Sequence, residues 1–169
     1  MDARTPYVEF FVPGRVASGG SKQGHWNPKA MRKDGQMGKV VMAPDSKYTK
    51  PWMAIVGAYA RDAMLQQQDN RMILWGPILL WIEFLFVRPK GHFGTGRNAD
   101  KLKPNAPHFH TSKPDGVKCC RSTEDACTGI IWRDDSQVAM HNLSKVYADP
   151  GQTPGASVKV YLLQPVEEM

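Results

Sequence analysis

Three aspartates that flank a short predicted helix are the residues of this chain best suited to chemistry. Asp115 stands where a loop enters the helix, and Asp134 and Asp135 stand beyond it, where the chain turns into a strand. Carboxylate oxygens are the ligands that Mg²⁺ prefers, and because a bound Mg²⁺ keeps several waters, two or three converging aspartates suffice. Such a metal ion generates a hydroxide and neutralises charge on a phosphate. The pattern predicts a phosphoryl-transfer site, with Mn²⁺ as an alternative metal ion.

Arg121 is the residue that would complete this site. It follows Val117 by one helical turn and precedes Asp125 by another, so all three share one face of the predicted helix. A guanidinium on that face can clamp a phosphate or stabilise charge in a transition state. The ordinary alternative is structural: the aspartates before and after the helix act only as a cap and a turn.

Two helices must position these groups. The first candidate covers residues 116–128 and is closed by Gly129, a residue type that favours the position after a helix. The other begins near Thr49, with Pro51 in its first turn, and carries apolar residues at helical spacing, which predicts a buried stripe. The stripe consists of Trp52, Ile55, Val56, Tyr59 and Ala63.

Strands are predicted at residues 7–12, 78–87, 138–147 and 158–163. The run from 78 to 87 is apolar except for Glu83, which indicates a central strand covered on both faces. The order strand, helix, strand, helix, strand, strand predicts an α/β fold in the broad sense (α+β). We expect one domain over residues 1–169, with a mixed sheet of about four strands and two main helices.

Positive charge is concentrated in two segments. The formal net charge is +6, and residues 15–50 and 88–121 each carry eight lysines and arginines against two acidic residues. Beyond Arg121 the sign reverses. Cations of this kind hold a nucleic-acid backbone through release of counterions. For either segment alone, an ordinary solvated loop explains the composition equally well. The candidate DNA-binding residues are Lys22, Lys29, Arg32, Lys33, Lys113, Lys118 and Lys145.

The first basic segment contains a long stretch without periodicity, at about residues 18–47, which is predicted as a flexible loop or ribbon. Trp26 within it and Tyr48 just after it can stack on unpaired bases. Alternatively, the segment is a solvated arm that becomes ordered only on binding. We favour contact with phosphates without base reading.

Three cysteines, Cys119, Cys120 and Cys127, fall in one short segment, which argues against a disulfide framework and for a reducing compartment. With His108 and His110 they could form a zinc site. Because no Cys-x-x-Cys pair is present, packing in the core is the favoured role, and structural zinc is not expected.

Neither a secretion signal nor a membrane span is expected. The first eleven residues lack the apolar core of a signal peptide, and the longest apolar run is about half of the roughly 20 residues that a span requires. We therefore expect a cytoplasmic protein that does not associate with membranes.

The segment from Lys113 to Val138 resembles a block found in RusA-type Holliday junction resolvases of phages and prophages. The block reads Lys/Arg-Pro-Asp-x-Asp-Asn/Lys-Leu-x-Lys/Arg, then Asp-Ala-Leu-x-Gly, then an aromatic residue, one further residue and Asp-Asp-x-Gln-Val. The N-terminal strand, its turn and the helix after it are similar too, so the resemblance covers nearly the whole chain. The matching residues are Lys113-Pro114-Asp115, Lys118, Arg121, Asp125-Ala126, Gly129, Trp132, Asp134-Asp135-Ser136-Gln137-Val138 and Lys145.

The resemblance implies a homodimeric, Mg²⁺-dependent endonuclease that cleaves four-way DNA junctions symmetrically in recombination and repair. In that family the first aspartate of Asp-x-Asp, the second of the Asp-Asp pair and the helical Lys/Arg are functional. Those roles fall on Asp115, Asp135 and Arg121, with the two aspartates as metal ligands. Asp125 and Asp134 match accessory acidic positions.

Val117 departs from the family pattern, because it stands where the second aspartate of Asp-x-Asp is expected. Losing a carboxylate weakens a Mg²⁺ site. Either Glu124 or Asp125, about two turns away on the same face, supplies the missing oxygen, or this protein binds junctions without cutting them. We favour an enzyme, with impaired activity as a variant of that prediction. A general nuclease acting on flaps or single strands is the third possibility.

Overall fold

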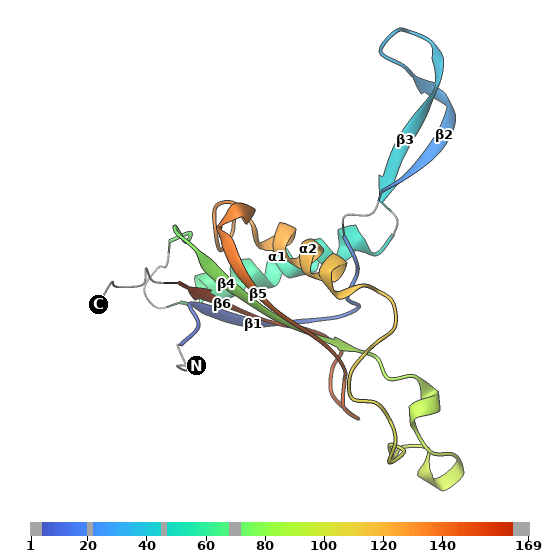
Figure 1. The fold of residues 1–169 in the computed structure, drawn as a ribbon, viewed down its shortest axis with the longest axis vertical. Helices are drawn as coiled ribbons and strands as arrows, with labels where there is room; N and C mark the ends of the chain where they lie inside the picture. The colour runs from blue at the N-terminus through green and yellow to red at the C-terminus, as the bar shows by residue number, and fades with distance from the viewer. Residues whose placement is uncertain (1–4, 20–21, 45–46, 68–71, 164–169) are drawn as a thin grey trace.

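The computed structural model describes residues 5–19, 22–44, 47–67 and 72–163. Four strands form the main sheet, in the order β1-β6-β4-β5 (Figure 1). They are β1 (Val8–Pro13), β4 (Ile78–Phe86), β5 (Val138–Tyr147) and β6 (Gly155–Leu162). Strand β6 runs antiparallel to both of its neighbours, whereas β4 and β5 are parallel. A parallel pair needs a crossover connection, and here that connection contains the second helix.

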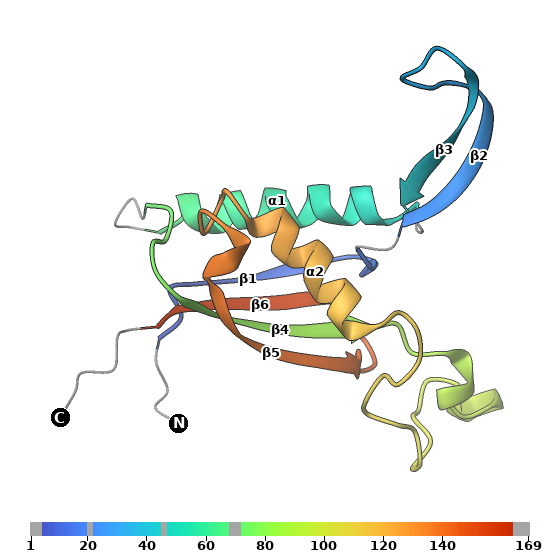
Figure 2. The same ribbon diagram turned by 45° about the horizontal axis from the view of Figure 1, so that its top comes forward.

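The helices α1 (Thr49–Leu65) and α2 (Gly116–Cys127) both lie on one face of this sheet (Figure 2). The predicted α/β class, the single domain body with a four-stranded mixed sheet and the two helices are confirmed. Both predicted helices and all four predicted strands are present, with ends within about three residues of the expected ones.

Strand β4 is central, as predicted, but the prediction that it is covered on both faces was wrong. Its residues alternate between buried and half-buried, because in the described part of the chain the helices cover one face only. On the other face Trp81 and Glu83 are partly exposed, and Lys159 lies over the Trp81 ring and pairs with Glu9 at 2.9 Å. An apolar run alone does not reveal this difference, since large apolar residues also occupy half-exposed positions.

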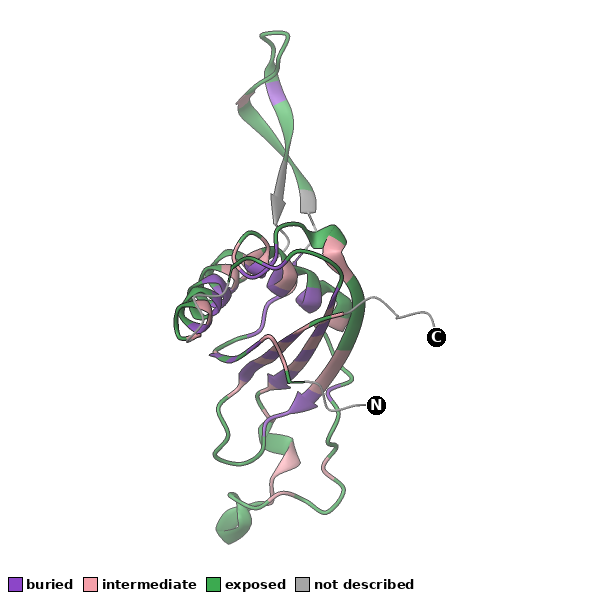
Figure 3. Ribbon diagram, turned by 90° about the vertical axis from the view of Figure 1, so that its left-hand side faces the viewer, coloured by how far each residue is buried: buried purple, intermediate pink, exposed green. Residues whose placement is uncertain are grey.

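The basic segment at 18–47 forms an antiparallel ribbon of β2 (Lys22–Met31) and β3 (Met37–Pro44). Of the two predicted alternatives, a flexible loop or a ribbon, the ribbon describes the secondary structure of the segment. The ribbon extends away from the sheet and helices, and nearly all of its described side chains are exposed (Figure 3). Since neither face packs on a core, neither strand needs the apolar alternation that would have revealed it.

The buried stripe of α1 differs in part from the predicted one. Trp52, Val56 and Ala63 are buried as expected, whereas Ile55 and Tyr59 are 40% and 39% exposed. Gly57 and Ala60 are buried in addition, and a Cβ added at Gly57 would lie in contact with the Ala126 carbonyl oxygen of α2, at 3.4 Å. The indole Nε1 of Trp52 donates to Thr123 Oγ1 of α2 at 3.2 Å, which fixes the two helices to each other. No described helix is long and apolar enough to cross a membrane.

Candidate functional site

A groove with a volume of about 410 Å³ runs along the exposed face of α2 and the edge of β5. The helix supplies most of its wall, at positions spaced by three or four residues, and the opposite face of the helix is buried. The lining residues are Val117, Cys120, Arg121, Glu124, Asp125, Asp135, His141 and Leu143.

The buried face of α2 holds the groove in place. The Ser122 hydroxyl donates to the Ala17 carbonyl at 2.6 Å, and the Thr123 hydroxyl accepts from the Trp52 indole N–H. Ser122, Thr123, Cys119 and Cys127 are all fully buried, so the cysteines pack in the core as the sequence predicted. This arrangement leaves Arg121 and Asp125 on the open side.

Asp135 is positioned by the turn that leads into β5. It begins a short 3₁₀ helix, η3 (Asp135–Gln137), which Asp134 caps by accepting from the Ser136 N–H at 2.9 Å. The Gln137 amide satisfies four backbone groups: its Oε1 accepts from Arg133 and Asp134, and its Nε2 donates to the carbonyls of Leu74 and Gly76, all within 3.0 Å. One side chain thus joins the aspartate turn to the segment that precedes β4.

Replacing Gln137 with Ala is expected to lower the free energy of unfolding by about 1–3 kcal/mol, because the backbone groups that it satisfies lose their partner. Asp135 would also lose its fixed position. Denaturant unfolding measures the first effect. The control is Gln152→Ala, which removes a single exposed hydrogen bond from a remote turn and is expected to change the free energy by well under 1 kcal/mol. Equal losses in the two variants would contradict the role of Gln137.

Negative charge is concentrated at one end of the groove. Burial raises the pKa of Asp125, the Arg121 guanidinium opposes that shift, and the charge of Asp135 adds to it. The pKa of Asp134 is instead lowered, chiefly by its hydrogen bond from Ser136. A carboxylate that lies beside a second carboxylate in this way provides a place where a cation is stabilised.

Asp115 lies at the other end of α2. Its Oδ1 accepts from the Val117 N–H at 2.9 Å, so it caps the helix, as the structural alternative proposed, and it is not part of the groove lining. Of the predicted catalytic residues, the structure therefore brings Arg121 and Asp135 to one groove and leaves Asp115 beyond its rim. Val117 projects into the groove with 68% of its surface exposed.

The predicted DNA-binding cations fall into two groups. Lys29, Arg32 and Lys33 are exposed on the β2–β3 ribbon, while the side chain of Lys22 lies outside the described residues. Lys118 is exposed on α2. Lys145 donates to the carbonyls of Ser112 and Pro114 at 2.8 and 2.7 Å, and so anchors the loop before α2.

Lys113 lines a second cavity, of about 590 Å³, between this loop, the segment that follows β1 and the end of β4. Arg15, Tyr48 and His110 line the same cavity, and the Arg15 guanidinium stacks 4.0 Å from the centre of the Tyr48 ring. His110 is buried and stacked on Phe86.

The sequence analysis did not identify His141 as a site residue, and it considered Cys120 only in a zinc combination with other residues. His141 lies beside Leu80 of β4, whose side chain is buried under the helices, so the imidazole points toward α2. The alternation of His141, Leu143 and Lys145 along β5 is the signal that could have revealed it. The zinc combination considered above is not assembled: among the described residues, only Cys120 of that set belongs to a group of three potential ligands.

Comparison with known proteins identifies a family to which this chain is similar. A family model described as Endodeoxyribonuclease RusA matches residues 22–161. A curated protein of Bacillus subtilis (strain 168), the uncharacterized protein YqaN, is 28% identical over 109 residues, which are 62% of this chain and 67% of YqaN. No solved structure matches.

Proposed function

Since the chain belongs to the RusA endodeoxyribonuclease family, we propose that it is a metal-dependent endonuclease that resolves four-way DNA junctions by hydrolysing phosphodiester bonds. The observation that carries this proposal is the convergence of Arg121 and Asp135 on one groove with Glu124 and Asp125. Arg121, Glu124 and Asp125 come from α2 and Asp135 from η3. Together they offer a cation for a phosphate beside carboxylates for a metal ion.

The donor set fits Mg²⁺ or Mn²⁺. Asp135 and Asp125 are exposed carboxylates whose charges disfavour each other, and Mg²⁺ is commonly held by one or two carboxylates together with waters and substrate phosphate. We propose Asp135 as the principal ligand and Asp125 as its neighbour. Asp115, the other ligand that the family resemblance implies, stands at the opposite end of α2 from these two carboxylates. When bound, the ion would activate a water and neutralise the scissile phosphate.

Arg121 has a separate role in this proposal. Its guanidinium stands one helical turn from Asp125 on the open face of α2, where it can donate two parallel hydrogen bonds to a phosphate. It would orient the phosphodiester and stabilise charge that develops on it. The burial of α2 on its other face holds this donor in place before DNA arrives.

The ribbon is proposed as an electrostatic arm that follows the DNA backbone. Replacing Lys29, Arg32 and Lys33 together with Ala is expected to weaken junction binding and to reduce the slope of log affinity against log salt by roughly 2–3, since each phosphate contact contributes about 0.9. A fluorescence-anisotropy titration at several salt concentrations measures this slope. As a control, Lys159→Ala removes a cation that already pairs with Glu9, and is expected to leave the slope unchanged. An unchanged slope in the triple variant would exclude the arm.

A homodimer in the cytoplasm of a bacterium or of a phage-infected cell is the proposed setting. Two symmetric nicks require two grooves, and one chain presents one such groove among its described residues. The three described cysteines are free and buried, in keeping with a reducing compartment. Light scattering should give twice the chain mass of 18.9 kDa.

The direct test uses a synthetic four-way junction, a flap and a plain duplex, each with Mg²⁺ or Mn²⁺. Paired symmetric nicks in the junction, with little cutting of the other substrates, would support the proposal. Equal cutting of flap and junction would replace it with a general nuclease. Tight junction binding without nicks in either metal ion would favour the binding-only alternative, for which the observation is the exposed Val117 in the groove.

A further inference from the structure

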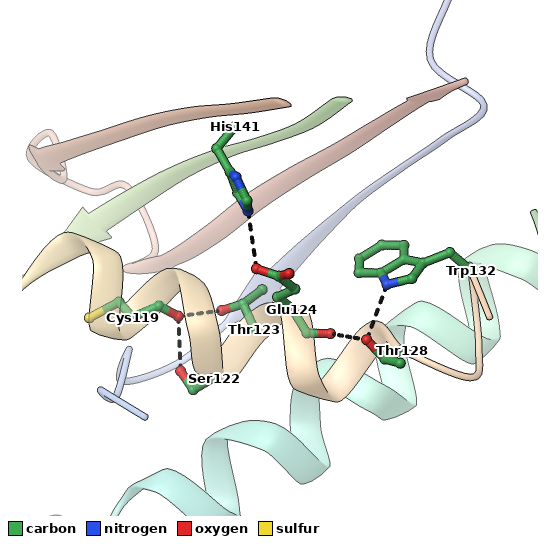
Figure 4. A network of polar contacts seen from close by, with 7 residues as sticks. All are labelled: Cys119, Ser122, Thr123, Glu124, Thr128, Trp132 and His141. Carbon is green, nitrogen blue, oxygen red and sulfur yellow. Dashed lines mark hydrogen bonds and ion pairs between the residues drawn. The ribbon is translucent and has the colours of Figure 1, made fainter. Parts of the chain in front are cut away.

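Three side chains of different chemistry meet on the wall of the groove. One potential ligand atom from each of Cys120, Glu124 and His141 lies within 4.8 Å of the others. The His141 Nε2 is 3.1 Å from Glu124 Oε2, and Figure 4 shows the imidazole reaching down from β5 to the carboxylate on α2. Among the described residues no other combination of His, Cys, Asp and Glu makes such a group.

The fold sets this geometry without any metal ion. Cys120 and Glu124 are four residues apart, so they lie one above the other on the same face of α2. His141 faces that side of the helix because its partner in β4, Leu80, is buried on the helix-covered face of the sheet. Cys120 is 5% exposed and the Glu124 side chain 17%, whereas His141 is 41% exposed, so the group opens toward the groove.

The three donors are a thiol, a carboxylate and an imidazole. Mg²⁺ selects oxygen ligands, whereas thiolate and imidazole favour Zn²⁺ and similar borderline ions. Catalytic zinc sites have three protein ligands and keep a fourth position open for water or substrate. Cys120, Glu124 and His141 match that number of protein ligands, and two of them carry the thiol and imidazole donors that Zn²⁺ favours.

We propose that Cys120, Glu124 and His141 form a three-ligand site for a divalent metal ion of the Zn²⁺ class, with its open position facing the groove. The site shares the groove with Asp135 and Asp125, the ligands proposed for Mg²⁺, but it uses a different set of donor atoms, and its occupancy does not depend on nuclease activity. Binding requires that the Cys120 sulfur give up its proton, which is released to solvent as the metal–sulfur bond forms.

The test is a titration of the full chain, kept reduced and first treated with a chelator, with Co²⁺ as a spectroscopic substitute for Zn²⁺. One equivalent per chain is expected, with a sulfur-to-cobalt charge-transfer band and visible bands typical of low coordination number. Zn²⁺ should displace the Co²⁺ and remove both signals. Cys120→Ser is expected to lose the charge-transfer band, and Glu124→Gln and His141→Asn to weaken binding by at least about tenfold.

Matched controls separate a site from a general effect. Cys119→Ala changes the neighbouring thiol, which faces the core, and His25→Asn changes an exposed histidine on the ribbon; both should titrate like the unaltered protein. His141 is exposed on an edge strand, so its variant should fold, which a circular dichroism melt verifies. No charge-transfer band at saturating Co²⁺, or equal loss in the Cys119 and Cys120 variants, would reduce the group to an ion pair beside a packed cysteine.

The Asp135→Asn variant separates Co²⁺ binding at this site from the proposed nuclease function. That variant is expected to bind Co²⁺ normally even if it no longer cleaves junctions. A chain that cleaves with Mg²⁺ but does not bind Co²⁺ would retain the proposed function and overturn this site alone.

Discussion

Asp135→Asn is expected to lower the rate of junction cleavage by at least about 100-fold while leaving junction affinity within a few-fold. Loss of an outer partner of a metal ligand typically costs 10- to 100-fold, and Asp135 is proposed as a ligand itself. Affinity should survive because the cations proposed to bind DNA are distributed over the ribbon and α2, and this change removes none of them. Single-turnover cleavage and anisotropy binding, on the same labelled junction, measure the two effects separately.

The matched control is the neighbouring aspartate. Asp134 caps η3 and does not line the groove, and Asn is as good a cap, so Asp134→Asn should stay folded and keep most of its activity. If Asp134→Asn inactivates the protein and Asp135→Asn does not, the roles of the pair are reversed. If neither change affects cleavage, the groove is not the site of chemistry.

Val117→Asp is expected to raise the cleavage rate by roughly 10- to 100-fold at low Mg²⁺ concentration. Changes to residues that support a metal site typically alter metal affinity or activity by this factor. Val117 is 68% exposed and projects into the groove with Asp135, so a carboxylate there would join the existing ones without opening a core cavity. An exposed substitution of this kind changes the free energy of unfolding by no more than about 0.5 kcal/mol. The measurement is the cleavage rate as a function of Mg²⁺ concentration, in which the half-saturating concentration should fall.

Val117→Asn is the control for this gain, since it has nearly the same shape without the charge. It should resemble the unaltered chain. Equal stimulation by Asn and Asp would point to polarity or local packing as the cause. A fall in cleavage with Asp would mean that Glu124 or Asp125 already supplies the oxygen and that a further negative charge repels the DNA phosphate.

Most of the fold could be predicted from local pattern. The α2 boundaries followed from Asp115 and Gly129, and β5 was predicted at the bounds that the structure shows, because the aspartate turn precedes it and the Asp149 turn follows it. The ribbon was not predicted as two strands, since strands that stand free of the core carry no apolar alternation. The exposure of Ile55 and Tyr59 depends on which face of α1 packs against the rest of the fold, and the spacing along a single helix does not fully fix that face.

The features of the candidate site, like those of the fold, were predicted only in part from the sequence. The sequence by itself determined the family block and the common helix face of Val117, Arg121 and Asp125. It also showed that valine stands at position 117, where the family pattern has an aspartate. These results depend only on residue type and helical spacing. Only the tertiary structure decided that Asp115 does not line the groove that holds Arg121 and Asp135, and that His141 reaches Glu124 across from β5. Contacts between a helix and a strand depend on the register of the strand against its neighbour and on the face of the sheet that the helix covers, and neither is encoded in the spacing along one segment.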